Sequence, residues 1–310
     1  MLSLPTAGVR RSVEAHNSDL FAFCDWVEAC VLFDEKELST TDIVDLMLEE
    51  EIYASQDFAR EFIADVWGEI RRRASLFSSP TNVRVDGERV VCDADWTADP
   101  AYAFCLALSL AKGFPDWAAA YGADYTEQGE LFERLTVESL EALMPHWKVF
   151  RTGWSVTQKN KLAAVVKDLV QRIFEVSGAE VDNWLATSAN EAGLDLVLYR
   201  EFRDATAGIP LFLFQCASGL NWEDKLEEPN LGAWQNIISF ASKPTKALSM
   251  PFCIAGIELR HAAMKIQGPL FDRYRILGAR SNPGSWPSAS LEEKLLDWIW
   301  PRVSALPRAS

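Results

Sequence analysis

The chain of 310 residues is 49% apolar and carries a formal net charge of −15. This length is sufficient for one large domain or two ordinary ones, and this apolar content excludes a wholly disordered chain. No apolar run has the length of a secretory signal or a membrane span, so we expect a cytoplasmic protein without membrane contact. The six cysteines lack CxxC spacing, which favours buried thiols over a zinc site.

The acidity is concentrated in the first part of the chain. Residues 1–124 contain 10 Lys+Arg and 23 Asp+Glu, a net of −13, whereas residues 125–310 contain 20 and 22, a net of −2. Such asymmetry predicts two units with different roles. We therefore expect an acidic, mainly helical N-terminal domain over 1–123 and a second domain over 124–310. The acidic domain would bind a protein partner or hold the second domain in check.

Apolar residues at helical spacing predict several helices in the first part. They span residues 18–34, 40–50, 56–77 and 99–112. Thr40 or Thr41 is expected to cap the second of them, and Arg71, Arg72 and Arg73 are interpreted as a solvated end of the third. Alternating valines around Asp86-Gly87 predict a β-hairpin over 82–92 with a two-residue type I′ turn.

The second part alternates predicted helices and strands, which is typical of an α/β domain with a mixed central sheet flanked by helices. The predicted helices span residues 126–144, 157–176, 221–242 with an interruption near Pro229, and about 290–299. The predicted strands span residues 147–152, 194–200, 210–216, 251–258 and 270–277. The tryptophans fall mostly on helix faces, which favours core packing over base stacking.

Two predicted strands each carry one strong polar residue. Asp195 stands at the entrance of one apolar strand, and Gln215 stands near the end of the next. Because a short loop joins these strands, we expect the two side chains to face each other at one end of the sheet. A carboxylate and an amide oxygen suit Mg²⁺ (or Mn²⁺), which polarises a phosphate oxygen and lowers the pKa of a bound water. The alternatives are a turn residue for Asp195 and a hydrogen-bonded core amide for Gln215.

An acid on a preceding helix, Glu133, extends this pattern. The resemblance rests on four segments in order: Gly129-x-x-Phe132-Glu133, Trp147–Thr152, Gly193–Val197 and Phe214–Cys216. Together they resemble the PD-(D/E)XK nuclease superfamily and, within it, the Mrr-like restriction endonucleases, over roughly residues 125–260. The resemblance implies a restriction-endonuclease-like fold in which Glu133, Asp195 and Gln215 bind the metal. It also implies a metal-dependent endonuclease acting on DNA, in a restriction or phage-defence system.

One departure from the family pattern concerns a lysine. The family has a lysine two residues after the second strand ligand, and this chain has Ala217 there. Lys225 is the nearest cation, and a short helix capped by Asn221 would return it to the sheet end as a catalytic residue. Glu191 is interpreted as a loop charge, with an additional ligand as the alternative.

Two other functions remain open on the sequence. One is a nuclease-derived module that no longer cuts and binds nucleic acid or a partner protein, which the missing lysine and the acidity favour. The other is a structural adaptor whose sheet carries no site. Such an adaptor predicts no change in melting temperature when metal is added, whereas a real site stabilises the fold by mass action.

Overall fold

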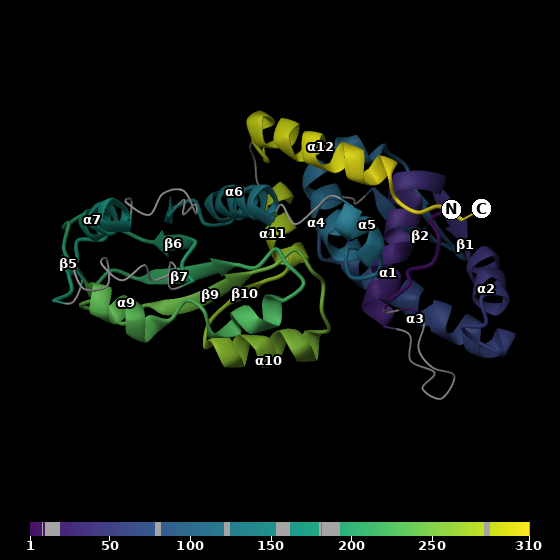
Figure 1. The fold of residues 1–310 in the computed structure, drawn as a ribbon, viewed down its shortest axis with the longest axis horizontal. Helices are drawn as coiled ribbons and strands as arrows, with labels where there is room; N and C mark the ends of the chain where they lie inside the picture. Colours follow the sequence, from purple (N-terminus) through teal and green to yellow (C-terminus); the bar gives the residue numbers. More distant parts are fainter. Residues whose placement is uncertain are drawn as a thin grey trace. The chain divides into compact units, whose positions relative to one another are not determined.

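The fold is taken from a computed structural model, drawn in Figure 1. It describes residues 1–7, 9, 19–77, 82–120, 125–152, 162–179, 181, 193–281 and 286–309. The chain forms two compact units. Unit 1 contains Met1–Asp124, Pro251–Cys253 and Pro287–Ser310, and unit 2 contains Tyr125–Met250 and Ile254–Trp286.

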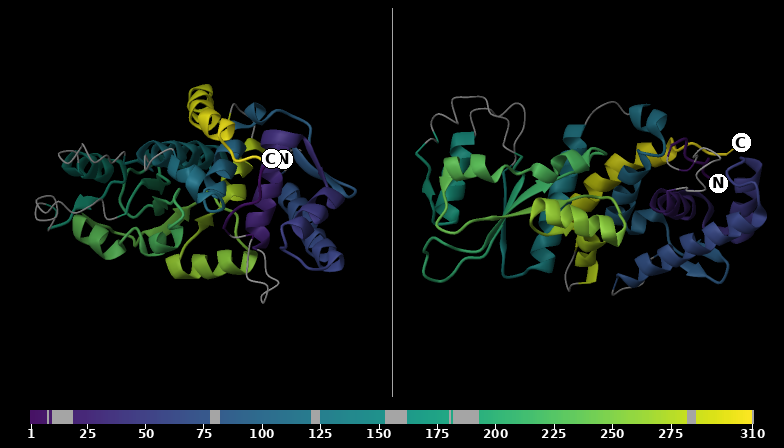
Figure 2. Two further views of the ribbon diagram at one scale, coloured as in Figure 1. Left: turned by 45° about the vertical axis from the view of Figure 1, so that its right-hand side comes forward. Right: turned by 90° about the horizontal axis from the view of Figure 1, so that it is seen from below.

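The first segment of unit 1 ends at Asp124, one residue after the expected boundary, and unit 1 also contains residues 287–310, which were expected in the second domain. The last helix, α12 (Ala289–Ser304), packs on α4 (Pro100–Leu110) in unit 1. Phe104 and Trp298 form an edge-to-face pair there, with ring centroids 4.9 Å apart. The two chain ends also meet within unit 1, because Leu2 pairs with Arg308 and the Ser3 amide donates to the Pro307 carbonyl over 3.0 Å (Figure 2).

Unit 1 is mainly helical, as predicted. Its other helical elements are α1 (Leu20–Cys30) continued by η1 (Val31–Glu35), α2 (Thr40–Glu49), α3 (Gln56–Ser75), η2 (Trp96–Ala98) and α5 (Pro115–Ala120). The cap of α2 was predicted one or two residues too late. Ser39 is the N-cap: its hydroxyl accepts from the Asp42 amide, and the Asp42 carboxylate accepts from the Ser39 amide, which completes a capping box.

A small antiparallel sheet with strand order β1-β3-β2 completes unit 1. Its strands are β1 (Glu37–Ser39), β2 (Val83–Asp86) and β3 (Arg89–Cys92). The hairpin prediction is confirmed, but the turn lies one residue later than expected. Asp86 pairs with Arg89, so Gly87 and Glu88 form the turn. Only Gly87 of these two has a positive φ, at 61°, which matches a type II′ turn rather than type I′.

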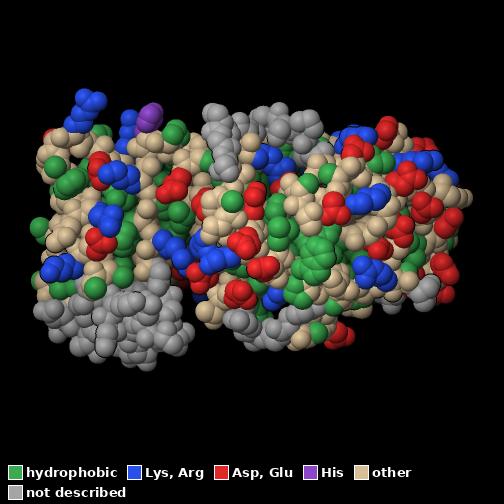
Figure 3. Space-filling model, turned by 90° about the horizontal axis from the view of Figure 1, so that it is seen from above, with side chains coloured by type: hydrophobic (Ala, Val, Ile, Leu, Met, Phe, Trp, Pro, Cys, Tyr) green, Lys and Arg blue, Asp and Glu red, His purple; other side chains and the backbone are tan. Residues whose placement is uncertain are grey.

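The interpretation of Arg71–Arg73 as a solvated helix end is wrong for Arg73. Its side chain is only 1% exposed and binds Asp25 at 2.8 Å, Glu28 at 3.1 Å and Glu69 at 3.0 Å. The helical repeat explains this, because Arg73 lies three and seven residues after the buried Ile70 and Val66 and so shares their face. In contrast to the buried acids around Arg73, many other acidic side chains of unit 1 lie at the surface, toward the right-hand end of Figure 3.

Unit 2 is built on a five-stranded mixed sheet with strand order β10-β9-β7-β6-β4. The strands are β4 (Lys148–Arg151), β6 (Leu196–Tyr199), β7 (Leu211–Cys216), β9 (Thr245–Ser249) and β10 (Leu270–Phe271). The β4-β6 and β6-β7 pairs are antiparallel, whereas the β7-β9 and β9-β10 pairs are parallel. The prediction of a mixed central sheet flanked by helices is therefore confirmed.

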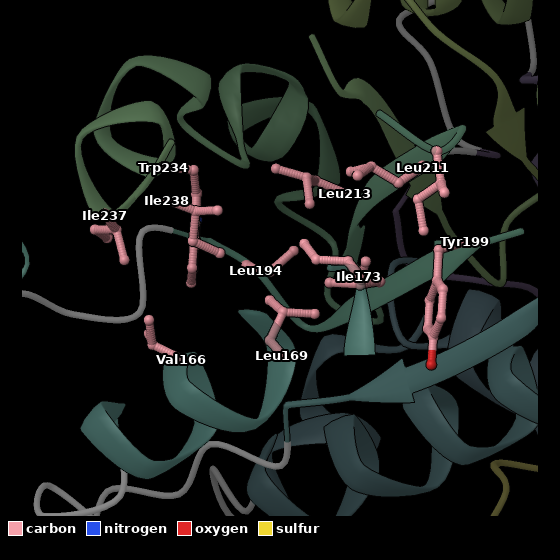
Figure 4. Packing of buried hydrophobic residues seen from close by; sticks show 12 residues of the cluster. Val166, Leu169, Ile173, Leu194, Tyr199, Leu211, Leu213, Trp234, Ile237 and Ile238 are labelled. Carbon is pink, nitrogen blue, oxygen red and sulfur yellow. The ribbon is translucent and has the colours of Figure 1, made fainter. Parts of the chain in front are cut away.

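Helices cover the sheet of unit 2. In Figure 1, α6 (Tyr125–Leu143) lies above the strands and α10 (Gly256–Ile266) lies below them. The first packs against β4, β6 and β7, and the second packs against β9 and β10. Near the far end of the sheet, α7 (Leu162–Arg172) and α9 (Leu231–Ile237) contribute to a core that includes Val166, Leu213 and Trp234 (Figure 4). The short strands β5 (Val176–Ser177) and β8 (Ile238–Ser239) pair with each other beside this core.

Three predicted elements after residue 220 differ from the structure. The predicted helix 221–242 is interrupted near Pro229 as expected, but its first part is a 3₁₀ helix, η4 (Trp222–Glu227), and its second part, α9, ends at Ile237 and is followed by β8. The predicted strand 251–258 contains no strand, because β9 precedes it, and Leu259, Ala262 and Ile266 then recur at helical spacing in α10. The predicted strand 270–277 ends after two residues, where Asp272 accepts from the Arg275 amide and caps α11 (Arg273–Leu277). The next turn is η5 (Gly278–Ser281).

The predictions for the tryptophans and the cysteines are confirmed. Trp26, Trp67, Trp234 and Trp298 are buried, and the cysteines are free thiols that are buried except for the partly exposed Cys216. Among the helices in the described ranges, none combines the length and apolarity needed to cross a bilayer.

Candidate functional site

The strand register places Asp195 beside Gln215. In the antiparallel β6-β7 pair Leu196 lies opposite Phe214. Asp195, which precedes Leu196, and Gln215, which follows Phe214, therefore form the next pair along the two strands. The Asp195 amide donates to the Phe214 carbonyl over 2.9 Å, which continues the ladder to this point. The structure therefore brings the two side chains together at the end of the sheet, as the sequence predicted.

The Asp195 carboxylate accepts hydrogen bonds from its neighbours on β7. The Gln215 amide nitrogen donates to Asp195 Oδ2 over 2.7 Å, and the Cys216 backbone amide donates to the same oxygen over 2.6 Å. On the other side, Thr152 donates from its backbone amide and its hydroxyl to the Asp195 carbonyl, over 2.9 and 2.8 Å. Asp195 is thus held on both sides, its carboxylate by β7 and its backbone carbonyl by Thr152, the residue after β4.

The amide oxygen of Gln215 is the unusual feature of the site. Gln215 is only 7% exposed, and its Oε1 is buried with no hydrogen-bond partner in the described part of the chain. A buried acceptor without a partner is unfavourable by about 1–3 kcal/mol, and native proteins avoid it unless a ligand or ion completes it. A carboxylate beside an unpartnered amide oxygen is an oxygen donor set that fits a hard divalent cation.

Glu133 on α6 lies in the same neighbourhood. Its Oε2 accepts from Arg151 Nε over 2.7 Å, and Arg151 Nη1 also lies 3.8 Å from Glu130. Burial raises the pKa of the Cys216 thiol well above its usual range, and the charges of Asp195 and Glu133 raise it further. Asp195 and Glu133 thus both raise the pKa of the Cys216 thiol, while Arg151 donates a hydrogen bond to Glu133.

The lysine predicted for the site does not contact it. Lys225 lies on η4, and within the described ranges it forms no ion pair or side-chain hydrogen bond with Asp195, Gln215 or Glu133. Ala217, at the position of the family's lysine, is buried. Glu191 lies outside the described residues.

Sequence reasoning missed Glu228 and Lys246. The Glu228 side chain lies against Gly193, where an added Cβ would stand 2.6 Å from Cβ and Cδ of the glutamate and closer still to Oε2. Lys246 on β9 donates to the carbonyls of Leu226 and Glu227, over 3.2 and 3.1 Å. The glycine at 193, two residues before Asp195, was a signal visible in the sequence, because glycine readily adopts a positive φ such as the 64° found there. Nothing in the local sequence around Glu228 pointed to Asp195, 33 positions away.

Within the described residues, no group of three or more His, Cys, Asp or Glu side chains is arranged to hold a metal ion. A cation site here would consist of one or two carboxylates, the Gln215 amide oxygen and water molecules, which is a coordination that Mg²⁺ accepts. Comparison of the chain with protein-family models, curated proteins and solved structures found no match. The nuclease interpretation therefore depends on the residues and geometry of this chain.

Proposed function

We propose that unit 2 is a restriction-endonuclease-like module that hydrolyses DNA phosphodiester bonds with Mg²⁺ or Mn²⁺. The observation that carries the proposal is the contact between Asp195 and Gln215, with the Gln215 oxygen buried and unpartnered. The order of elements supports it, because α6 with Glu133, then β4, α7, β6 with Asp195 and β7 with Gln215 follow the order of the PD-(D/E)XK motifs.

The residues of the chain would act by holding and orienting charge. Asp195 and Gln215 would bind the cation through oxygen atoms, and the resemblance assigns Glu133 as the third ligand. When bound, such a cation polarises a phosphate oxygen and lowers the pKa of a coordinated water. The hydrogen bonds from Gln215 and Cys216 fix the Asp195 carboxylate before any ligand arrives, so little ordering is left for the binding step.

A plasmid-cleavage assay tests the proposal. The purified full chain is incubated with supercoiled DNA and Mg²⁺ or Mn²⁺, beside an Asp195→Ala variant and a metal-free control. We expect nicked or linear products that require the metal and disappear in the variant. Cleavage that persists in the variant at the wild-type rate would refute the assignment of Asp195.

The alternative function is a module that binds nucleic acid or a partner protein without cutting. The buried Ala217 at the lysine position favours it, as does the absence of a contact between Lys225 and Asp195 in the described ranges. Unit 2 contains 17 Lys+Arg and 19 Asp+Glu, so binding to DNA would need a local basic face rather than net charge. Retention of DNA in a mobility-shift assay, without products in the plasmid assay, would support this alternative.

The acidic unit 1 is proposed to bind a protein partner or to restrain the nuclease. Its 26 Asp+Glu against 13 Lys+Arg disfavour contact with a polyanion. A defence role and a cytoplasmic location are parts of the proposal that come from the family resemblance.

A further inference from the structure

A second buried oxygen without a partner among the described residues lies against Gly193, two residues before Asp195. Oε2 of Glu228 is buried and has no hydrogen-bond partner among the described residues, as is also true of Oε1 of Gln215. A buried carboxylate oxygen is costly to leave unpaired, because the charge has lost its water without gaining a donor or a counter-ion. Both oxygens are thus available as ligands for a cation.

Gly193 explains how the Glu228 carboxylate reaches this end of the sheet. The glutamate side chain, from Cβ to Oε2, lies directly over the Gly193 α-carbon, a place that any side chain at 193 would fill. Two trans peptide units separate the Gly193 and Asp195 α-carbons by at most about 7.6 Å. The Glu228 carboxylate is therefore beside the chain segment that presents Asp195.

The segment that carries Glu228 is attached to the sheet. The Glu228 amide donates to the Lys225 carbonyl over 3.0 Å, which places Glu228 directly after the last turn of η4. The Lys246 ammonium binds the carbonyls of Leu226 and Glu227, the last two residues of that helix. Lys246 lies opposite Leu213, two positions before Gln215 on the neighbouring strand. The carboxylate is thus positioned by β9.

We infer that Glu228 provides the second carboxylate of the cation site, together with Asp195 and the amide oxygen of Gln215. This inference rests on the proposed function and changes its ligand set, because Glu228 replaces Glu133. Glu133 is bound by Arg151 at 2.7 Å and has its charge compensated, whereas no ion pair of Glu228 is found in the described ranges. Two carboxylates and an amide oxygen, completed by water, match the ligand preference of Mg²⁺ and Mn²⁺.

Metal binding by conservative variants tests the assignment. Mn²⁺ is titrated into the full chain and followed by calorimetry and by the shift in melting temperature, for the wild type, Glu228→Gln, Glu133→Gln and Asp195→Asn. Glu227→Gln, an exposed acid one position away, is the matched control for the change in charge. We expect Glu228→Gln to weaken Mn²⁺ binding on the order of tenfold or more. Glu227→Gln should bind Mn²⁺ as the wild type does, and Glu133→Gln shows whether the helix acid contributes to binding.

The metal-free proteins provide an independent readout. Glu228→Gln removes the charge from a carboxylate whose Oε2 is buried without a hydrogen-bond partner among the described residues, so its melting temperature without metal should equal or exceed that of the wild type. If it is nevertheless unfolded, Glu228→Asp decides the question, since it keeps the charge and withdraws it by one methylene. Unchanged Mn²⁺ affinity in that folded variant would overturn the inference.

The outcomes separate this inference from the proposed function. If Asp195→Asn loses the Mn²⁺ response and Glu228→Gln keeps it, the site stands and the role of Glu228 is wrong. Loss of the response in Glu133→Gln alone would assign the second carboxylate to Glu133 instead. A wild-type protein that does not respond to Mn²⁺ at all would refute both proposals.

Discussion

Replacing Arg73 by methionine tests the buried charge cluster of unit 1. The guanidinium contacts Asp25, Glu28 and Glu69, whose side chains are 8%, 2% and 8% exposed. Methionine fills similar volume but leaves three carboxylates buried without their shared cation. Breaking a buried ion pair in this way costs about 3–5 kcal/mol. For a unit of this size that corresponds to a loss of about 6–20 °C in melting temperature, at about 2–4 °C per kcal/mol.

The pH dependence of this loss gives a second check. Burial by itself raises the pKa of Glu69, but hydrogen bonds from Arg72 and the charge and hydrogen bonds of Arg73 outweigh it and lower the pKa below its usual value. In the wild type this carboxylate stabilises the fold above its unfolded pKa, and the stabilisation is lost as the pH falls through the lowered folded pKa. In Arg73→Met the three carboxylates lose their shared cation, so desolvation and mutual repulsion favour their protonated forms. The difference in melting temperature between the wild type and Arg73→Met should therefore become smaller as the pH falls from 7 to 5.

Differential scanning calorimetry of the full chain measures both effects. Arg71→Met is the control, because Arg71 is exposed on the same helix and, among the described residues, its side chain donates only to the Gly87 carbonyl, over 3.2 Å. Its effect should stay within about 0.5 kcal/mol. If Arg73→Met melts with the control, or if its deficit grows on acidification, the account of a charge cluster that needs its arginine is wrong.

Other predictions concern single contacts. Ser39→Ala removes the capping box of α2 and should lower the free energy of unfolding by about 1 kcal/mol in urea titration, whereas Ser39→Asp should retain most of it. Gly193→Ala forces a side chain into a backbone with φ of 64° and into Glu228, so it should destabilise unit 2 and weaken the Mn²⁺ response; an unchanged melting curve would contradict that packing. Thiols whose pKa burial raises should react with a thiol reagent at pH 8 only after unfolding, and rapid labelling of the native protein would contradict this for Cys24, Cys30, Cys92 and Cys216.

Local patterns were sufficient to predict most elements of the fold. The helices of unit 1 and the β4, β6 and β7 strands carry strong apolar periodicity, and the structure has them near the predicted positions. The errors fall where the pattern was short or ambiguous. Around Pro251 an apolar run suggested a strand, although the strand had ended at Ser249 and a helix begins at Gly256. The start of α11 at its N-cap Asp272 was likewise hidden in a run of charged and aromatic residues.

The meeting of Asp195 and Gln215 was determined by the sequence alone. Two apolar strands joined by a short loop must pair as neighbours, and period-two alternation then brings the acid and the amide to one place. Tertiary structure decided which other charged side chains lie beside Asp195 and Gln215. Arg151 engages Glu133, and Glu228 reaches the Gly193 backbone, through contacts between segments that no local pattern relates. Burial of Arg73 and the place of α12 in unit 1 were decided in the same way, because the partners of a charge or an apolar face depend on packing between distant segments, whereas periodicity reports only which face is buried.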